Sequence, residues 1–181
     1  MIPILSIVGR SNSGKTTLIE RLIPEMIRRG YRVGTIKHNR HGFEIDREGK
    51  DSWRHRKAGA AVTVIASPAQ VAVVEDAERD YEIAELADRY IRGVDIVISE
   101  GFKKNNHPKI EVWRSSEHHE FLCEARDNLI GIASDLPVER GVPRFDLNDI
   151  RGLADLIEKS ILKKIRNPET RIQRNPGTAS R

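Results

Sequence analysis

A glycine-rich and hydroxyl-rich segment near the start of this sequence has the residue types that bind phosphate. Residues 9–17 read Gly-Arg-Ser-Asn-Ser-Gly-Lys-Thr-Thr and fill every defined position of the pattern G-x-x-x-x-G-K-[ST]. Backbone N–H groups surround a phosphate only where the chain turns tightly, and glycine makes such turns without a Cβ clash. The segment therefore predicts a loop that binds the phosphates of a nucleotide.

The helix predicted after this loop indicates which loop residues would contact the phosphates and the metal ion. The first turn of a helix carries unpaired amides and the positive end of the helix dipole, so we expect the β-phosphate over residues 13–16. Lys15 would reach the β- and γ-phosphates, and the hydroxyl of Thr16 would bind Mg²⁺. The predicted nucleotide-binding residues are Gly9, Arg10, Ser11, Asn12, Ser13, Gly14, Lys15, Thr16 and Thr17.

A magnesium ion at such a loop also needs a carboxylate, and two acidic residues are candidates. Glu100 ends the apolar run 94–99, which is typical of a strand buried on both faces of a parallel sheet. Ligands of open α/β sheets collect at the carboxyl ends of strands, so Glu100 is predicted to bind metal and, with Lys15, to act in catalysis. Asp46, in a polar loop, is the second metal candidate. The alternatives are an ion-paired or capping Glu100 and a solvated Asp46.

Other polar segments allow both a functional and a structural interpretation. Residues 37–55 hold three histidines and several cations; they either recognise a second anionic ligand or form a solvated loop, and the lack of a nearby cysteine disfavours zinc. Residues 103–109 either clamp phosphates or form a charged turn. Asp135 follows a predicted central strand, a position from which a carboxylate can read a purine edge. His118 and His119 are predicted to be exposed.

A strand–helix–strand unit must position the phosphate-binding loop. The apolar run 4–8 predicts the first strand, and the spacing of apolar residues over 14–29 predicts a helix that Pro24 kinks or splits. Gly30 is expected to end this helix, and residues 31–38 predict a second strand, parallel to the first. The residues predicted to face the core from the helix are Leu18, Ile19, Leu22, Ile23, Met26 and Ile27.

The whole pattern predicts a three-layer α/β P-loop NTPase fold, with a mostly parallel sheet and an added antiparallel hairpin. Residues 61–66 and 70–74 flank a Ser-Pro-Ala turn and predict the hairpin. The alternation of polar and apolar residues over 109–114 predicts a half-exposed strand. The other predicted strands are 94–101, 129–135 and 144–147, and the other predicted helices are 51–58, capped by Asp51 and Ser52, 81–91 and 150–165.

Length and charge favour one domain with a basic tail. We place a P-loop nucleotide-binding domain at 1–165 of the 181 residues and a basic, disordered tail at 166–181. Residues 163–181 hold six basic residues and one acidic residue, a net charge of +5, so residues 1–162 carry a net charge of −1 and the overall charge of +4 comes from the C-terminal segment. No apolar run approaches the roughly 20 residues of a membrane helix. The single cysteine, Cys123, and the lack of an evident signal peptide favour a cytoplasmic protein.

Several motifs, in this order along the chain, resemble one known family. The sequence closely resembles the molybdopterin-guanine dinucleotide biosynthesis protein B (MobB) family over about residues 1–165. The segments that carry the resemblance are residues 9–17, Lys37-His38, His41, Asp46, Gly49-Lys50-Asp51-Ser52, Arg54-His55, Ala58-Gly59-Ala60, Glu100-Gly101-Phe102-Lys103 and Pro108-Lys109-Ile110-Glu111.

The resemblance implies an activity and a set of partners. A member of this family is expected to bind GTP, to hydrolyse it weakly, and to form a homodimer through its sheet. It would assist the guanylyltransferase that attaches GMP to molybdopterin, so molybdopterin or its guanine dinucleotide is an implied ligand. Carried over by motif, the GTP phosphates fall to residues 9–17 and Mg²⁺ falls to Thr16 with Glu100.

Two other functions remain open on the sequence. The same loop would serve a small-molecule kinase, in which residues 39–51 hold an acceptor alcohol. A nucleotide-gated nucleic-acid binder would use the basic tail, for which we expect weak binding without sequence preference. No catalytic base is identifiable, and Arg10 is the candidate for an arginine finger.

Overall fold

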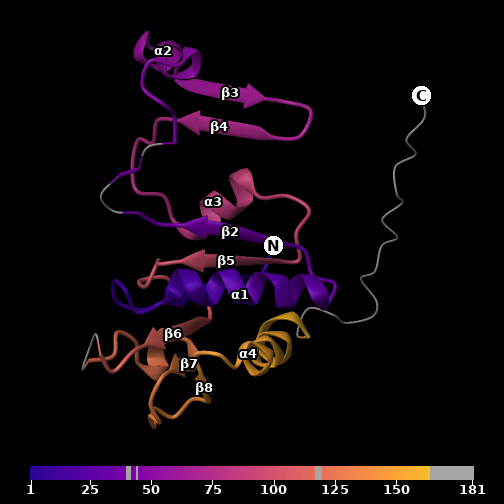
Figure 1. The fold of residues 1–181 in the computed structure, drawn as a ribbon, viewed down its shortest axis with the longest axis vertical. Helices are drawn as coiled ribbons and strands as arrows, with labels where there is room; N and C mark the ends of the chain where they lie inside the picture. The colour runs from indigo at the N-terminus through magenta and orange to yellow at the C-terminus, as the bar shows by residue number, and fades with distance from the viewer. Residues whose placement is uncertain (40–41, 44, 117–119, 164–181) are drawn as a thin grey trace, which may run out of the picture.

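A six-stranded parallel sheet forms the centre of the fold (Figure 1). The computed structural model describes residues 1–39, 42–43, 45–116 and 120–163, so the predictions for His41, for His118 and His119, and for the tail lie outside the described residues. The strands follow the order β2-β5-β1-β6-β7-β8, and every neighbouring pair is parallel. Their bounds are β1 (Ile4–Val8), β2 (Val33–Lys37), β5 (Ile96–Glu100), β6 (Lys109–Trp113), β7 (Leu129–Ser134) and β8 (Arg144–Asp146).

Helices cover both faces of this sheet, which confirms the predicted α/β layers. On one face, α1 (Lys15–Arg28) packs with α4 (Ile150–Ile157) and the π-helical turn η2 (Glu158–Leu162). On the other, α3 (Ile83–Tyr90) packs at the β5 side, and segments around Phe121 and Val138 pack at the β7 side. Successive strand residues point to opposite faces, so Leu5 and Ile98 contact the first layer while Ile4 and Val97 contact the second.

Helix α1 is continuous through Pro24, so the predicted split is wrong. Leu18, Leu22 and Met26 are buried, as predicted, but Ile27 is 58% exposed. The row Leu18, Leu22 and Met26 stays within the buried face, but residues four apart advance by about 40° around a helix of 3.6 residues per turn, so a neighbouring row at the edge of that face turns towards solvent. Along this row Ile19 is buried, Ile23 is partly buried and Ile27 faces solvent.

Strand β6 corrects the sequence prediction most clearly, because it is a central strand and not a half-exposed one. It lies between β1 and β7, and its polar residues Lys109 and Glu111 are 0% and 1% exposed. The Lys109 ammonium donates to the backbone carbonyls of Asp127, at 2.7 Å, and of Asn105. The Glu111 carboxylate accepts from the N–H groups of residues 122 and 123, at 2.6 and 3.0 Å. The alternation of polar and apolar residues along β6 therefore comes from buried charged side chains with backbone partners, and not from a solvent-exposed face.

The predicted hairpin is present and forms its own two-stranded sheet beyond the β2 edge of the main sheet (Figure 1). Its strands are β3 (Val62–Ala66) and β4 (Val71–Glu75), paired antiparallel, with the short helix α2 (Asp51–Lys57) packed beside β3. Helix α2 begins after Lys50 without a side-chain cap, so the predicted capping by Asp51 and Ser52 is wrong. The Ser52 hydroxyl instead donates to Asp46.

The single cysteine lies in the core. Cys123 is buried, and burial raises the pKa of its thiol to about 11. A short 3-10 turn, η1 (Ala125–Asp127), follows Cys123 and leads into β7. Within the part of the chain that the structure describes, none of the helices combines the length and apolar character needed to cross a membrane.

The buried Lys109 yields a stability prediction. Lys109→Met keeps the length and apolar stem of the side chain but leaves buried carbonyl oxygens without a donor, which should lower the free energy of unfolding by about 2 kcal/mol or more. Urea unfolding followed by circular dichroism measures this change. Lys104→Met, at an exposed lysine of the preceding loop, is the matched control and should have little effect. Equal stability of the two variants would contradict the role given to Lys109.

Candidate functional site

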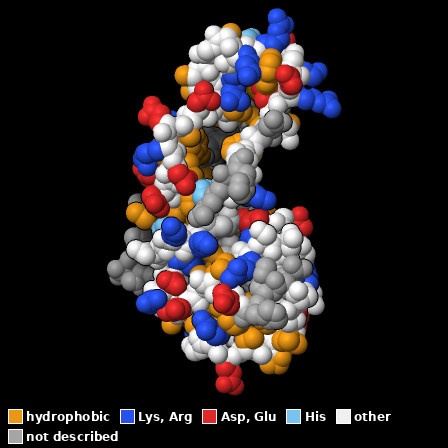
Figure 2. All heavy atoms as spheres, turned by 90° about the vertical axis from the view of Figure 1, so that its left-hand side faces the viewer, with side chains coloured by type: hydrophobic (Ala, Val, Ile, Leu, Met, Phe, Trp, Pro, Cys, Tyr) orange, Lys and Arg blue, Asp and Glu red, His pale blue; other side chains and the backbone are white. Residues whose placement is uncertain are grey.

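The phosphate-binding loop lies where β1 ends at the carboxyl edge of the sheet, the side of the molecule that faces the viewer in Figure 2. Gly9 follows β1 directly, and a Cβ atom there would lie 2.5 Å from the carbonyl oxygen of Val112 and 2.6 Å from the Ser13 hydroxyl. Asn12 and Gly14 have φ angles of 64° and 96°, in the left-handed region. Glycine is therefore required at position 9 by the close approach of β6.

The start of α1 is left available for an anion. The first helical hydrogen bond runs from the Leu18 N–H to the Gly14 carbonyl at 2.9 Å, so the amides that precede Leu18 in the first turn lack helical partners. Among the described residues, no side chain caps this end and no acidic residue occupies its first turn. The Ser13 hydroxyl is buried and finds no hydrogen-bond partner in the part of the chain that the structure describes. Unpaired donors and the positive dipole end together fit a phosphate group.

Two lysines and one carboxylate surround this helix start. The Lys15 ammonium donates to the Arg10 carbonyl at 2.6 Å, and the Lys37 ammonium lies 3.5 Å from a Glu100 oxygen. Burial lowers the pKa of Lys15, and Lys37 lowers it further, whereas Glu100 raises it. The positive charges lie on the side where a nucleotide would place its terminal phosphates.

The structure brings Thr16 and Glu100 together, as their sequence positions predict. The Thr16 hydroxyl donates to Glu100 at 3.0 Å, and the Glu100 side chain is 17% exposed. A hydroxyl and a carboxylate beside a phosphate-binding loop are the oxygen ligands that Mg²⁺ prefers. Asp46 is not brought to this pair: its contact is with the Ser52 hydroxyl at 2.9 Å, and its other oxygen is buried and has no hydrogen-bond partner among the described residues. Its metal role stays a prediction.

Arg114 is a site residue that sequence reasoning missed. Its Nε donates to the Ser13 carbonyl at 3.1 Å, and its guanidinium lies 3.3 Å from where a Cβ on Gly14 would be. The available signal was its position immediately after β6, at the carboxyl end of a strand. That signal has meaning only if β6 is central and parallel, which its alternating pattern concealed.

Other candidates are engaged within the protein. Asp135 accepts from both the N–H and the hydroxyl of Ser115, each at 3.0 Å, and its base-reading role stays a prediction. His38 contacts Asp80 through Nε2 at 3.0 Å, and Arg10 pairs with Glu120 at 3.3 Å. In the described ranges, no group of three or more His, Cys, Asp or Glu residues is arranged to hold a metal ion.

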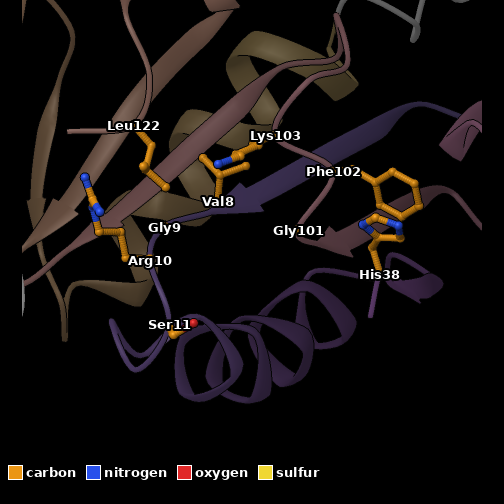
Figure 3. A pocket seen from close by; sticks show the side chains of 9 residues that line it. All are labelled: Val8, Gly9, Arg10, Ser11, His38, Gly101, Phe102, Lys103 and Leu122. Atoms are coloured by element: carbon orange, nitrogen blue, oxygen red, sulfur yellow. The ribbon is translucent and has the colours of Figure 1, made fainter. Parts of the chain in front are cut away.

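A pocket of about 480 Å³ opens beside the phosphate-binding loop (Figure 3). One wall is formed by the end of β1 and the start of the loop, residues 8–11. The opposite wall is formed by residues 101–103, which follow Glu100, together with His38. Leu122 closes the side next to Arg10. The pocket is thus continuous with the phosphate-binding loop.

Comparison with known proteins gives consistent matches. The sequence model of the family described as "MobB: Molybdopterin guanine dinucleotide synthesis protein B" matches residues 4–135. The chain is 40% identical over 158 residues to the molybdopterin-guanine dinucleotide biosynthesis adapter protein of Haemophilus influenzae, covering 87% of this chain and 88% of that protein. It is 39% identical over 169 residues to the adapter protein of the same name from Escherichia coli, covering 91% and 96%.

Solved structures agree with these sequence matches. A crystal structure of molybdopterin-guanine biosynthesis protein B superposes with a TM-score of 0.68 at 31% identity, covering 86% of this chain and 98% of that one. The crystal structure of Bacillus subtilis MobB gives a TM-score of 0.67 at 31% identity, covering 87% and 97%. The fold described above is therefore the fold of those proteins.

The close approach at Gly9 yields a prediction about the loop. Gly9→Ala should weaken binding of a fluorescent nucleotide at least about tenfold, because the new methyl group displaces either Val112 or the loop. Gly30→Ala is the matched control: Gly30 also has a positive φ, but a Cβ there meets no atom within 4 Å. A titration that gives both variants the parental affinity would contradict the geometry assigned to the loop.

Proposed function

The chain belongs to the MobB family, and from that premise we propose that it binds GTP and Mg²⁺ as an adapter for the enzyme that attaches GMP to molybdopterin. Its fold is the nucleotide-binding P-loop fold of the solved MobB structures. The observation that supports nucleotide and metal binding is the Thr16–Glu100 contact at the uncapped start of α1. Both residues lie at the end of the helix where an anion is stabilised.

Each group of the site has a role in this proposal. The amides at the start of α1, the Ser13 hydroxyl and the Lys15 ammonium would hold the phosphates of GTP. The Thr16 hydroxyl and the Glu100 carboxylate would hold Mg²⁺, which neutralises phosphate charge when bound. Arg114 would keep the loop in shape through the Ser13 carbonyl.

Slow hydrolysis follows from the partners of the nearby side chains. Glu100 is engaged by Thr16 and Lys37, and His38 is engaged by Asp80, so neither is free to act as a general base. We therefore infer that the GTP-bound protein turns over slowly and acts by engaging its guanylyltransferase partner.

The role of Glu100 is tested by a change that keeps its shape and removes its charge. Glu100→Gln should reduce Mg²⁺-dependent GTP hydrolysis by about 10–100-fold, the size seen when a group that supports a metal is altered. Nucleotide binding without metal should change little. Hydrolysis measured against Mg²⁺ concentration reads out the effect.

Two variants calibrate this experiment. Lys15→Ala should abolish hydrolysis, because the terminal phosphates lose their ammonium partner. Glu78→Gln, at an exposed acid outside the site, should behave as the parent. An unaltered Mg²⁺ titration for Glu100→Gln would rule out its metal role, and a burst of turnover on adding molybdopterin alone would indicate a kinase instead.

We also propose that the protein is a homodimer, and the hairpin supports this. One face of the β3–β4 sheet is apolar yet solvent-exposed, with Val64 and Val73 paired across it at 60% and 48% exposure. Val62 and Val71 lie on the same face and are 52% and 68% exposed. A two-stranded sheet is marginal alone, and exposed apolar patches mark interfaces. A second copy is the partner that would cover this face.

Light scattering during gel filtration tests the homodimer. Val73→Lys should convert the protein to monomer, because it places a charge in the apolar face of the hairpin. Leu136→Lys, which changes an exposed apolar residue elsewhere, is the control and should leave the dimer intact. A monomeric parent protein, or a dimeric Val73→Lys, would contradict the proposal.

A further inference from the structure

The pocket beside the phosphate-binding loop has features of a binding site that the nucleotide does not account for (Figure 3). Its volume of about 480 Å³ is in the range of small-molecule sites. Its lining contains two aromatic rings and two cations but no carboxylate. A pocket of this composition suits a ligand that is both flat and negatively charged.

The backbone at one wall is held in an uncommon conformation. Phe102 has a φ of 53°, which bulky L-residues rarely adopt, and it follows Gly101 with a φ of 97°. Asn105 fixes this segment by donating to the Phe102 carbonyl and to the Ser6 hydroxyl. Such conformations persist where the surroundings enforce them, and they concentrate at ligand sites. Here the enforced conformation places the Phe102 ring at the pocket.

The two aromatic side chains form a platform. The Phe102 and His38 rings stack with centroids 4.5 Å apart and planes inclined by 30°. The contact between His38 and Asp80 fixes the imidazole orientation. In Figure 3 both rings lie on the same side of the pocket, opposite Arg10. A planar heterocycle gains stacking energy on such a surface without losing side-chain freedom.

The charges at the pocket are arranged around the same space. In Figure 3, Lys103 lies between the aromatic platform and Arg10, and among the described residues it has no hydrogen bond or ion pair. Arg10 lines the opposite side, with its guanidinium paired to the exposed Glu120. An anionic group carried by a stacked ring would therefore meet an ammonium that the described residues do not engage.

The position of the pocket distinguishes its ligand from the nucleotide base. The Lys15 ammonium, which serves the terminal phosphates, lies 2.6 Å from the carbonyl of Arg10, a pocket residue. Gly101, which also lines the pocket, directly follows Glu100. The pocket thus adjoins the terminal-phosphate end of the loop, and the base of the same nucleotide lies at the other end of its phosphate chain. A ligand in this pocket would therefore be a second molecule.

We propose that this pocket binds a planar nitrogen heterocycle carrying a phosphate monoester, with the ring on the His38–Phe102 platform and the phosphate at Lys103 and Arg10. This inference rests on the proposed function, to which it adds the ligand class: a phosphorylated pterin, the chemical class of molybdopterin. A nucleoside monophosphate shares the same chemistry and is the alternative source. The two are separated by experiment.

Quenching of pterin fluorescence by the full-length protein tests the proposal. Neopterin phosphate should quench saturably, and Phe102→Leu should weaken its binding about tenfold, the effect of losing one stacking contact. Leucine keeps the apolar contact that Phe102 makes with the core beneath it. Phe145→Leu, at a partly buried phenylalanine on β8, is the matched control and should bind as the parent does.

A second pair of variants tests the contact with the phosphate group. Lys103→Gln should weaken neopterin phosphate about tenfold and leave unphosphorylated neopterin unchanged, because it removes a charged donor. Lys104→Gln, at the neighbouring exposed lysine outside the pocket, should change neither. Equal losses for both ligands, or none for either, would overturn the phosphate assignment.

The remaining outcomes separate this inference from the proposed function. All titrations are made without nucleotide and repeated with GDP and Mg²⁺, while GTP binding is measured independently with a fluorescent analogue. Bound GTP with no saturable pterin quenching, or an unchanged Phe102→Leu, overturns the inference and leaves the proposed function standing. Saturable pterin binding without GTP binding overturns the proposed function and leaves the pterin site standing. GMP that displaces neopterin phosphate from the GDP-saturated protein at equal concentration overturns the pterin assignment.

Discussion

The close approach of Gly9 to the carbonyl oxygen of Val112 is the constraint on which the site depends. It brings the loop after β1 against β6, while β5 pairs with β1 on the other side. Because the three strands are parallel, the residues that follow each of them meet at one edge of the sheet. The Lys15 ammonium, the Glu100 carboxylate and the Arg114 guanidinium thus surround one helix start, although they are far apart in the chain.

Buried charges on β6 connect this edge to the rest of the fold. Burial lowers the pKa of Lys109 and raises that of Glu111, and backbone partners hold both side chains in the core. Lys109 ties the segment after β5 to the turn before β7, and Glu111 ties the segment that carries Leu122 to the sheet. The segment after β5 and the segment that carries Leu122 line opposite sides of the pocket, so each of the two buried charges helps to position one of its walls.

Much of the nucleotide site was accessible from the sequence, because its signals are local. The phosphate-binding loop is one continuous segment, and the strand before it and the helix after it follow from periodicity within a few residues of it. The position of Glu100 followed from an apolar run that marks a buried parallel strand. Chain order within a strand–helix–strand unit then fixed the edge of the sheet at which these groups meet.

The sequence by itself therefore determined the phosphate-binding loop, the parallel strands and the hairpin. Only the tertiary structure decided which strand is central and which side chains complete the site. Alternation along β6 looks the same whether its polar residues face water or find buried partners, and the partners of Lys109 and Glu111 lie on other segments. The contact of Arg114 with Ser13 likewise joins residues about 100 positions apart, and the His38–Phe102 stack joins residues 64 positions apart. Local patterns report the exposure of one segment, whereas contacts between distant segments arise from strand order and packing.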